Sequence, residues 1–180
     1  IEMMVVVAVI GILTAIAFVS MLHYRTIIRV NASAREMAGQ MRYARAKAIR
    51  EGMSVKVLFT GLNQYVIGVD ADESGGFDTS FPKTHFLQPG IRYGYFPGIN
   101  QIPGHKWPVT CSVDVNNCGT NEVHFRHDGT VSYSGVVYII PQNDLSDTGN
   151  RDDRMRAVDW EKTTGRIRSW KWKAGAKTWR

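Results

Sequence analysis

The first residues of the chain form an apolar run that limits the possible folds more than any other feature. From Met3 to Leu22 every residue is apolar except Thr14 and Ser20. As an α-helix, a run of about 20 residues spans about 30 Å, the thickness of the hydrocarbon core of a bilayer. The run is too long for a cleaved secretory signal, and no small-residue cleavage site follows it. We therefore expect residues 1–22 to be a transmembrane helix.

The helical pattern continues beyond this run and becomes amphipathic. Apolar residues recur at spacings of three and four, and cations lie off that face. The apolar positions are Ile27, Val30, Ala34, Met37, Ala38, Met41, Ala44, Ala48 and Ile49, and the cations are Arg25, Arg29, Arg35, Arg42 and Lys47. Nothing interrupts the pattern before Gly52, a residue suited to a helix C-cap. The sequence thus predicts one helix of about 50 residues, in which residues 23–52 pack on a folded domain.

From Ser54 the apolar period changes to two, which is typical of β-strands. The segments "SVKVLFT" and "QYVIGV" predict one hairpin. The run "EVHFRHDGTVSYSGVVYII" predicts a second around its Asp-Gly turn, with another break at Ser134-Gly135, and "MRAVDWE" with "GRIRSWKW" predicts a last pair. Residues 71–121 are rich in Gly, Pro and Asn, which indicates long loops with short strands. We expect an α+β fold in which the helix packs on a small antiparallel β-sandwich or two sheets, with a globular β domain at 53–165 and a basic, Trp-rich strand or tail at 166–180.

The chain shows no arrangement of residues typical of a catalytic site. A nucleophile with its base, a metal cluster or paired carboxylates in a cleft would be needed, and none is recognisable, so we expect no enzymatic activity and no cofactor. His124 and His127 lie close together, but zinc would require more ligands nearby. We interpret this pair as a half-exposed strand end.

The segment "DADESGGFD" has the spacing of a calcium-binding loop. Its oxygen ligands would come from Asp70, Asp72, Ser74 and Asp78, with Gly75 at the sharp turn. The closing glutamate is replaced by Phe81. An acidic hairpin loop is therefore the preferred interpretation, and we assign no metal site.

Two cysteines, Cys111 and Cys118, lie in the segment "TCSVDVNNC". They predict one local disulfide if the domain is outside the cytoplasm. The alternatives are two free thiols or half of a zinc site, and zinc is disfavoured because the sequence has no second Cys pair. In the chain-entropy model so short a loop would stabilise the fold by about 2–3 kcal/mol.

The C-terminal segment concentrates cations and tryptophans. The net charge is +6, and seven of the 22 Lys and Arg residues lie between Arg166 and Arg180. In a strand, arginines and tryptophans would alternate onto one face, where they could bind phosphate and stack on bases. The candidate nucleic-acid residues are Arg166, Arg168, Trp170, Lys171, Trp172 and Lys173. Alternatively, the tryptophans pack on the helix or a neighbouring subunit, and the arginines protect an exposed sheet edge from aggregation.

The N-terminal segment "IEMMVVVAVIGILTAIA" resembles that of type IV pilins and type II secretion pseudopilins. In that family a prepilin peptidase removes a leader, and Glu2 matches the glutamate that pairs with the N-terminal amine of an adjacent subunit during filament assembly. The segments "MRYARAKAIREGMSVKVLF", "FRHDGTVSYSG" and "TTGRIRSW" resemble the GspH/FimT-like branch of minor pilins and pseudopilins. The resemblance implies a pilin-like fold and methylation.

This resemblance implies a structural subunit of a type IV pilus or a type II secretion pseudopilus, acting in assembly, initiation or at the tip. The implied partners are other subunits in a helical filament, the inner-membrane assembly platform, the prepilin peptidase and the inner membrane. Arg25 and Arg29 alone would place the domain in the cytoplasm, but the basic family leader implies a single-pass protein with a periplasmic domain, and a periplasmic or extracellular filament after assembly.

The alternative function is a DNA receptor in natural transformation. The segment "GRIR" resembles the C-terminal Gly-Arg-x-Arg motif of FimT-like pilins that bind DNA, with Gly165, Arg166 and Arg168 at the matching positions.

Overall fold

The computed structural model of the 180-residue chain describes residues 2–74, 76–78, 82–95, 102, 121–144, 154–173 and 178–180, without the side chains of 2 and 17–23. The two cysteines, Cys111 and Cys118, lie outside the described residues. Their disulfide therefore stays a prediction.

One helix, α1 (Glu2–Glu51), of 50 residues confirms the length predicted from the sequence. Its end is also as predicted, because Gly52 has a positive φ of 68° and donates its N–H to the Ala48 carbonyl at 3.0 Å. This left-handed position satisfies a carbonyl of the last turn and favours glycine. No helix within the described residues is both long enough and apolar enough to cross a membrane.

The amphipathic half of α1 buries one face against the domain. Seven of its apolar residues are at most 3% exposed: Val30, Ala34, Met37, Ala38, Met41, Ala44 and Ala48. Ile49 was predicted on this face, but it is 50% exposed because it lies at the last turn, beside Gly129 of a tight turn. The helix thus sits on the domain through small residues and methionines, which allow close approach of the strands.

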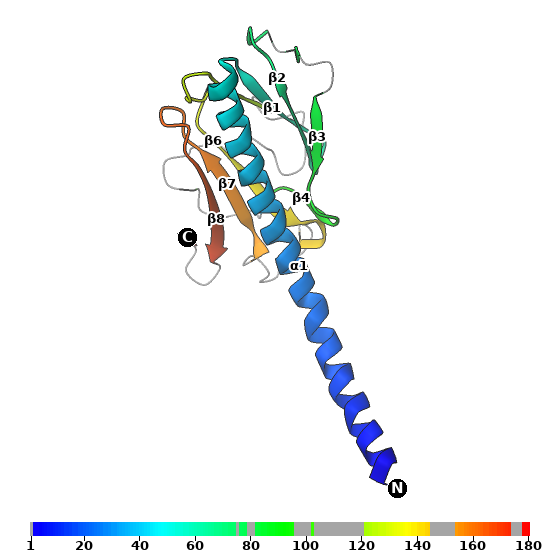
Figure 1. Ribbon diagram of the computed structural model, residues 1–180. Helices are drawn as coiled ribbons and strands as arrows, with labels where there is room; N and C mark the ends of the chain where they lie inside the picture. The colour runs from blue at the N-terminus through cyan, green and yellow to red at the C-terminus, as the bar shows by residue number, and fades with distance from the viewer. Residues whose placement is uncertain are drawn as a thin grey trace.

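The helix packs against two antiparallel sheets (Figure 1). The four-stranded sheet has the order β3-β2-β1-β5, and the five-stranded sheet has the order β4-β6-β7-β8-β9. The strands of the first are β1 (Val55–Thr60), β2 (Gln64–Val69), β3 (Lys83–Phe86) and β5 (Glu122–Phe125). Those of the second are β4 (Ile91–Tyr93), β6 (Gly135–Pro141), β7 (Arg156–Trp160), β8 (Ile167–Lys173) and β9 (Thr178–Trp179), with a 3₁₀ turn η2 (Gln142–Asp144) after β6.

The predicted β1–β2 and β7–β8 hairpins are confirmed by their antiparallel registers. The second predicted hairpin is only partly correct. The Asp128-Gly129 turn is present, but beyond it the strand is reduced to one bridge between Phe125 and Val131. The chain then switches sheets, and β6 begins at Gly135. The break predicted at Ser134-Gly135 marks this change of sheet.

The main core lies where α1 packs on β1 of one sheet and on β6, β7 and β8 of the other. Phe59 of β1 stacks on Trp160 of β7 with ring centroids 6.1 Å apart, which joins the two sheets directly. A second apolar cluster contains residues of β6, β7, β8 and β9, including Tyr138, Trp172 and Trp179. The central strands β6 and β7 of the five-stranded sheet are therefore buried on both faces.

Candidate functional site

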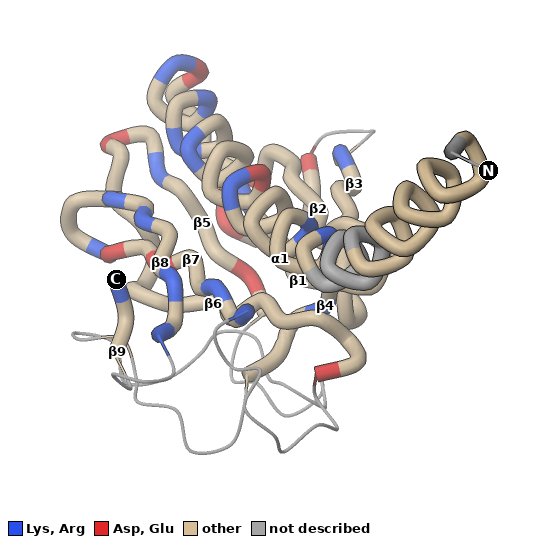
Figure 2. The backbone as a smooth tube through the Cα atoms, turned by 90° about the horizontal axis from the view of Figure 1, so that it is seen from below, with Lys and Arg blue, Asp and Glu red and all other residues tan. Residues whose placement is uncertain are grey.

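The N-terminal part of α1 projects beyond the domain as an apolar rod (Figure 1). Every described side chain from residue 3 to 16 is exposed, including Met3 at 81% and Ile16 at 68%. Figure 2 shows that Lys and Arg colour the part of α1 over the domain and are absent from its projecting part. A helix that is apolar on all sides is normally buried by other chains or by lipid. The described part of the chain leaves this apolar rod exposed.

The one described polar side chain on the rod is satisfied internally. Thr14 donates its hydroxyl to the Ile10 carbonyl at 2.8 Å, as Thr often does within a helix. The rod can therefore enter an apolar environment without burying an unpaired hydroxyl. Glu2 is the first residue of α1, and its side chain lies outside the described part of the chain. Its pairing with a neighbouring amine stays a prediction.

The candidate nucleic-acid residues lie on or next to β8, and the predicted alternation is observed. Ile167 packs into the main core, whereas Trp172 belongs to the cluster on the opposite face. The expected edge strand or exposed end is found only in part, because β8 pairs with β7 along Ile167–Lys171 and with β9 only at Trp172 and Lys173. Arg166, Lys171 and Lys173 are exposed.

The tryptophans serve mainly as core residues of the outer cluster. Trp172 is 2% and Trp179 is 6% exposed, and their ring centroids are 5.1 Å apart. Trp179 also packs on Tyr138 at 5.4 Å, while Trp170 is half-buried at the margin of the cluster. Trp172 thus packs on the chain's own C-terminal residues and not on the helix, and packing of a tryptophan on a neighbouring subunit stays a prediction. Trp172 has no free ring face for a base.

Arg168 is also engaged within the protein. Its guanidinium donates to Asp159 Oδ2 at 2.9 Å and lies 4.9 Å from the ring centroid of Trp170. Asp159 is fully buried, so Arg168 balances a carboxylate that would otherwise be costly. Arg168 is therefore a structural cation in this fold.

Arginines of α1 bind the two turns that flank the end of the helix. Arg45 donates Nε to the Gly129 carbonyl at 2.9 Å and Nη2 to the Thr164 carbonyl at 2.8 Å. Arg42 donates to the Ile167 carbonyl at 3.2 Å. With Arg166 and Gly165, these residues line a pocket of about 340 Å³. The sequence did not predict that these residues lie together, because α1 and residues 165–167 are more than a hundred positions apart.

The close approach of Arg45 and Gly129 to this turn requires glycine at position 165. Its φ is +61°, and a Cβ there would overlap the Gly129 carbonyl oxygen and the Arg45 guanidinium. Gly165→Ala is expected to destabilise the fold by more than the about 1–2 kcal/mol of a left-handed alanine, and to lower Tm by more than about 3 °C in thermal denaturation. Gly90→Ala is the matched control, because Gly90 has a φ of +80° and open space around its Cβ position. Equal losses in the two variants would contradict the overlap.

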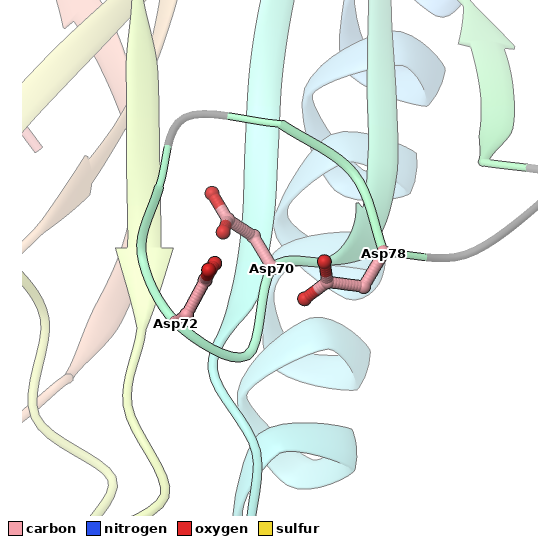
Figure 3. Close-up of side chains that lie close together, drawn as sticks. All are labelled: Asp70, Asp72 and Asp78. Atoms are coloured by element: carbon pink, nitrogen blue, oxygen red, sulfur yellow. The ribbon is translucent and has the colours of Figure 1, made fainter.

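Histidine 124 lies where the sequence did not place it. The sequence predicted that both His124 and His127 lie at a half-exposed strand end. This prediction is wrong for His124, which is buried at 7% exposure, whereas His127 is exposed. His124 pairs directly opposite Lys56 in the β1–β5 register, and its Nδ1 is 3.8 Å from Asp70 Oδ2. Asp70, Asp72 and Asp78 come together in the loop that follows β2 (Figure 3).

Comparison with solved structures shows a known fold. The type IV minor pilin FimU of Pseudomonas aeruginosa aligns with a TM-score of 0.52 and 16% identity, over 77% of this chain and 86% of that one. The minor pseudopilin EpsH from the Type 2 Secretion System of Vibrio cholerae aligns with a TM-score of 0.48 and 13% identity, over 78% of this chain and 95% of that one. At these identities the likeness to FimU shows the fold alone.

Comparison with curated proteins gave no match. The family model described as "Type II transport protein GspH" matches residues 33–151, which include the packed part of α1 and the strands up to β6. Because the match extends over more than half of the chain, this protein belongs to the GspH family.

Proposed function

We propose that this chain is a minor pilin or pseudopilin, a non-enzymatic structural subunit of a type IV pilus or a type II secretion pseudopilus. The observation that carries the proposal is the exposed apolar rod of α1. Met3 at 81%, Ile10 at 57% and Ile16 at 68% exposure leave an apolar surface that the described part of the chain does not cover. Membership of the GspH family and the fold shared with FimU support the same role.

Helices of neighbouring subunits are the partners that fit this rod. Side-by-side packing of such helices removes apolar surface from water at about 25 cal/mol per Å². The rod has no preferred face, because its residues are apolar on every side, so one helix can contact several neighbours at once. A filament built this way would have the rods at its centre and the β domains outside.

Glu2 would set the position of each subunit along the filament. A carboxylate in apolar surroundings costs several kcal/mol unless a cation pairs with it. The amine of an adjacent subunit would provide that cation, and subunits in any other register would leave the charge unpaired. The other proposed partners are the assembly platform and the prepilin peptidase. The subunit itself would stand at the tip or at the start of the filament.

The proposal is tested by Glu2→Ala in the cell that produces the filaments. We expect the variant to fall at least tenfold in the sheared filament fraction, measured by immunoblot, with unchanged total protein. Glu36→Ala is the control, since Glu36 is an exposed carboxylate on the packed part of the same helix. Equal incorporation of both variants would remove the role of Glu2. Absence of the wild-type chain from the filament fraction would contradict the subunit role itself.

DNA binding through the C-terminal strand stays a prediction, and no specific contact favours it. Trp172 is buried, and Arg168 is paired with Asp159. Among the described residues of this end, Arg166, Lys171, Lys173 and Arg180 are exposed cations, whereas Arg168 is half-buried. The filament role is therefore the one we propose.

A further inference from the structure

The pocket between the last turns of α1 and the β7–β8 turn, here called the arginine pocket, is lined by three arginines. Arg42 and Arg45 come from α1, and Arg166 is the residue before β8. Arg42 and Arg166 are exposed, whereas Arg45 is half-buried. The volume of about 340 Å³ lies at the lower end of the range of ligand pockets, about 300–1,000 Å³. The pocket therefore suits one or two side chains and not an extended polymer.

The positive charge of the arginine pocket is not neutralised within the described part of the chain. Arg45 donates to the carbonyls of Gly129 and Thr164, and Arg42 donates to that of Ile167. These carbonyls are neutral acceptors, so they hold the two guanidiniums in place without cancelling their charge. By contrast, four other arginines each pair with a carboxylate: Arg50, Arg126, Arg154 and Arg168.

The nearest acidic residue along the chain does not supply the missing negative charge. Glu161 lies at the start of the turn that contains Gly165, and its carboxylate accepts the Thr164 hydroxyl at 3.2 Å. No ion pair among the described residues joins Glu161 to an arginine. The arginine pocket thus attracts an anion from outside the described chain, because charge of one sign in a hollow raises the local concentration of the opposite charge.

Aliphatic side chains complete the lining of the pocket. They are Ala46 and Ile49 of α1 and Ile167 of β8. Such a lining displaces water from around the guanidiniums, and a lower local dielectric strengthens their attraction for an anion. It also offers apolar contact to the methylene groups of an acidic side chain.

The lining favours a protein carboxylate over a nucleic acid. Proteins that bind single strands place aromatic rings beside their cations, so that bases can stack. No aromatic side chain is found among the described residues that line the pocket, and Trp172 and Trp179 are buried in the outer cluster. A guanidinium matches the two oxygens of a carboxylate, and arginine is enriched at protein interfaces.

The place of the pocket on α1 also favours another subunit over lipid. The pocket lies beside residues 42–49, at the end of the helix away from the apolar rod (Figure 1). At about 1.5 Å per residue, Arg42 is about 40 Å along the helix from Ile16. A bilayer or a bundle of rods around residues 3–16 would therefore not reach the pocket, whereas the β domain of a neighbouring subunit can.

We propose that the arginine pocket is a docking site for an Asp or Glu side chain on a neighbouring filament subunit. The inference rests on the proposed function, because the partner comes from the filament. Arg42 and Arg166 would bind the carboxylate, while Arg45 holds the two turns and adds positive charge. A rod that is apolar on every side does not fix the rotation of a subunit about α1. The docked carboxylate would fix it.

The first test uses the purified full chain in detergent and an end-blocked, fluorescein-labelled tetraglutamate peptide. Fluorescence anisotropy should show binding that weakens as salt rises, and labelled tetraglutamine should not bind. Arg42→Gln with Arg166→Gln should weaken tetraglutamate binding at least tenfold. Lys171→Gln with Lys173→Gln is the matched control, because it removes two exposed cations outside the pocket. The control should keep its affinity within about twofold.

A single substitution separates the pocket from the stability of the fold. Arg166→Gln alone leaves the hydrogen bonds of Arg42 and Arg45 intact, and it should still weaken tetraglutamate binding about threefold. Equal affinity of the arginine and lysine double variants would overturn the proposal. If single-stranded DNA bound the wild type in place of tetraglutamate and lost affinity in the arginine variant, a nucleic acid would be the occupant, and the proposal would be overturned as well.

The second test follows both double variants in the cell that produces the filaments. The arginine variant should fall at least fivefold in the sheared filament fraction relative to the lysine variant, with equal total protein. Equal incorporation of the two variants would overturn the docking site and leave the subunit role standing. Absence of the wild-type chain from the filaments would overturn both, so the two failures are distinguishable.

Discussion

Ile10→Asp is expected to abolish incorporation of the chain into filaments. Ile10 lies in the middle of the apolar rod and is 57% exposed, so packing of neighbouring helices would bury the new carboxylate without a partner. Such a charge in apolar surroundings costs several kcal/mol, which corresponds to a loss of more than about 100-fold in the equilibrium for subunit addition. The measurement is the amount of the chain in purified filaments relative to total cell protein.

The same substitution should leave the fold of the β domain intact. Every described side chain of residues 3–16 is exposed, and the buried face of α1 begins at Val30, so Tm of the purified chain should change by less than about 2 °C. Ile10→Leu is the control, because it keeps the apolar surface and should assemble normally. Filaments that contain Ile10→Asp at the wild-type level would contradict burial of the rod.

Trp160→Ala is expected to cost about 3–5 kcal/mol of unfolding free energy, as is usual when a large aromatic side chain is removed from a core. Trp160 is fully buried, stacks on Phe59 of the other sheet with an interplanar angle of 13°, and donates its indole N–H to the Tyr133 carbonyl at 3.0 Å. The variant therefore loses packing across the junction of the two sheets. Thermal denaturation should show a Tm lower by about 6–20 °C.

Trp160→Phe separates the two contributions. Phenylalanine retains an aromatic ring against Phe59 but leaves the Tyr133 carbonyl without its indole donor, at a cost of about 1–3 kcal/mol. It should therefore unfold at a temperature between those of the wild type and Trp160→Ala. If Trp160→Ala lost less than about 1 kcal/mol, the junction of the sheets would not depend on this residue.

Local signals were sufficient to predict α1 and two of the hairpins. The three-and-four spacing up to Gly52 predicted α1 and its end, and the period of two with short polar turns predicted the β1–β2 and β7–β8 hairpins. These features depend on residues close in sequence. The sheet change at Gly135 was only partly foreseen, because the turn at Gly129 is equally compatible with a longer hairpin.

The roles of individual side chains depended on contacts between distant segments. Trp172 alternates with Ile167 as expected, but only the return of β9 shows that its face of the sheet is covered. His124 reaches Asp70 because β1 lies between β2 and β5, an order that spacing does not reveal. Gly165 could be identified as a turn residue, yet its contact with Arg45 arises only when α1 crosses the turn.

The unbroken helix has a mechanical consequence for a subunit held by its N-terminal half. A pull on the rod passes to the domain along the packed face of α1, which begins at Val30 and contacts strands of both sheets, and at the helix end Arg45 also binds one turn of each sheet, at Gly129 and at Thr164. The load is thus divided between the two sheets. Tension on the rod would therefore reach the core between the two sheets and not a single strand.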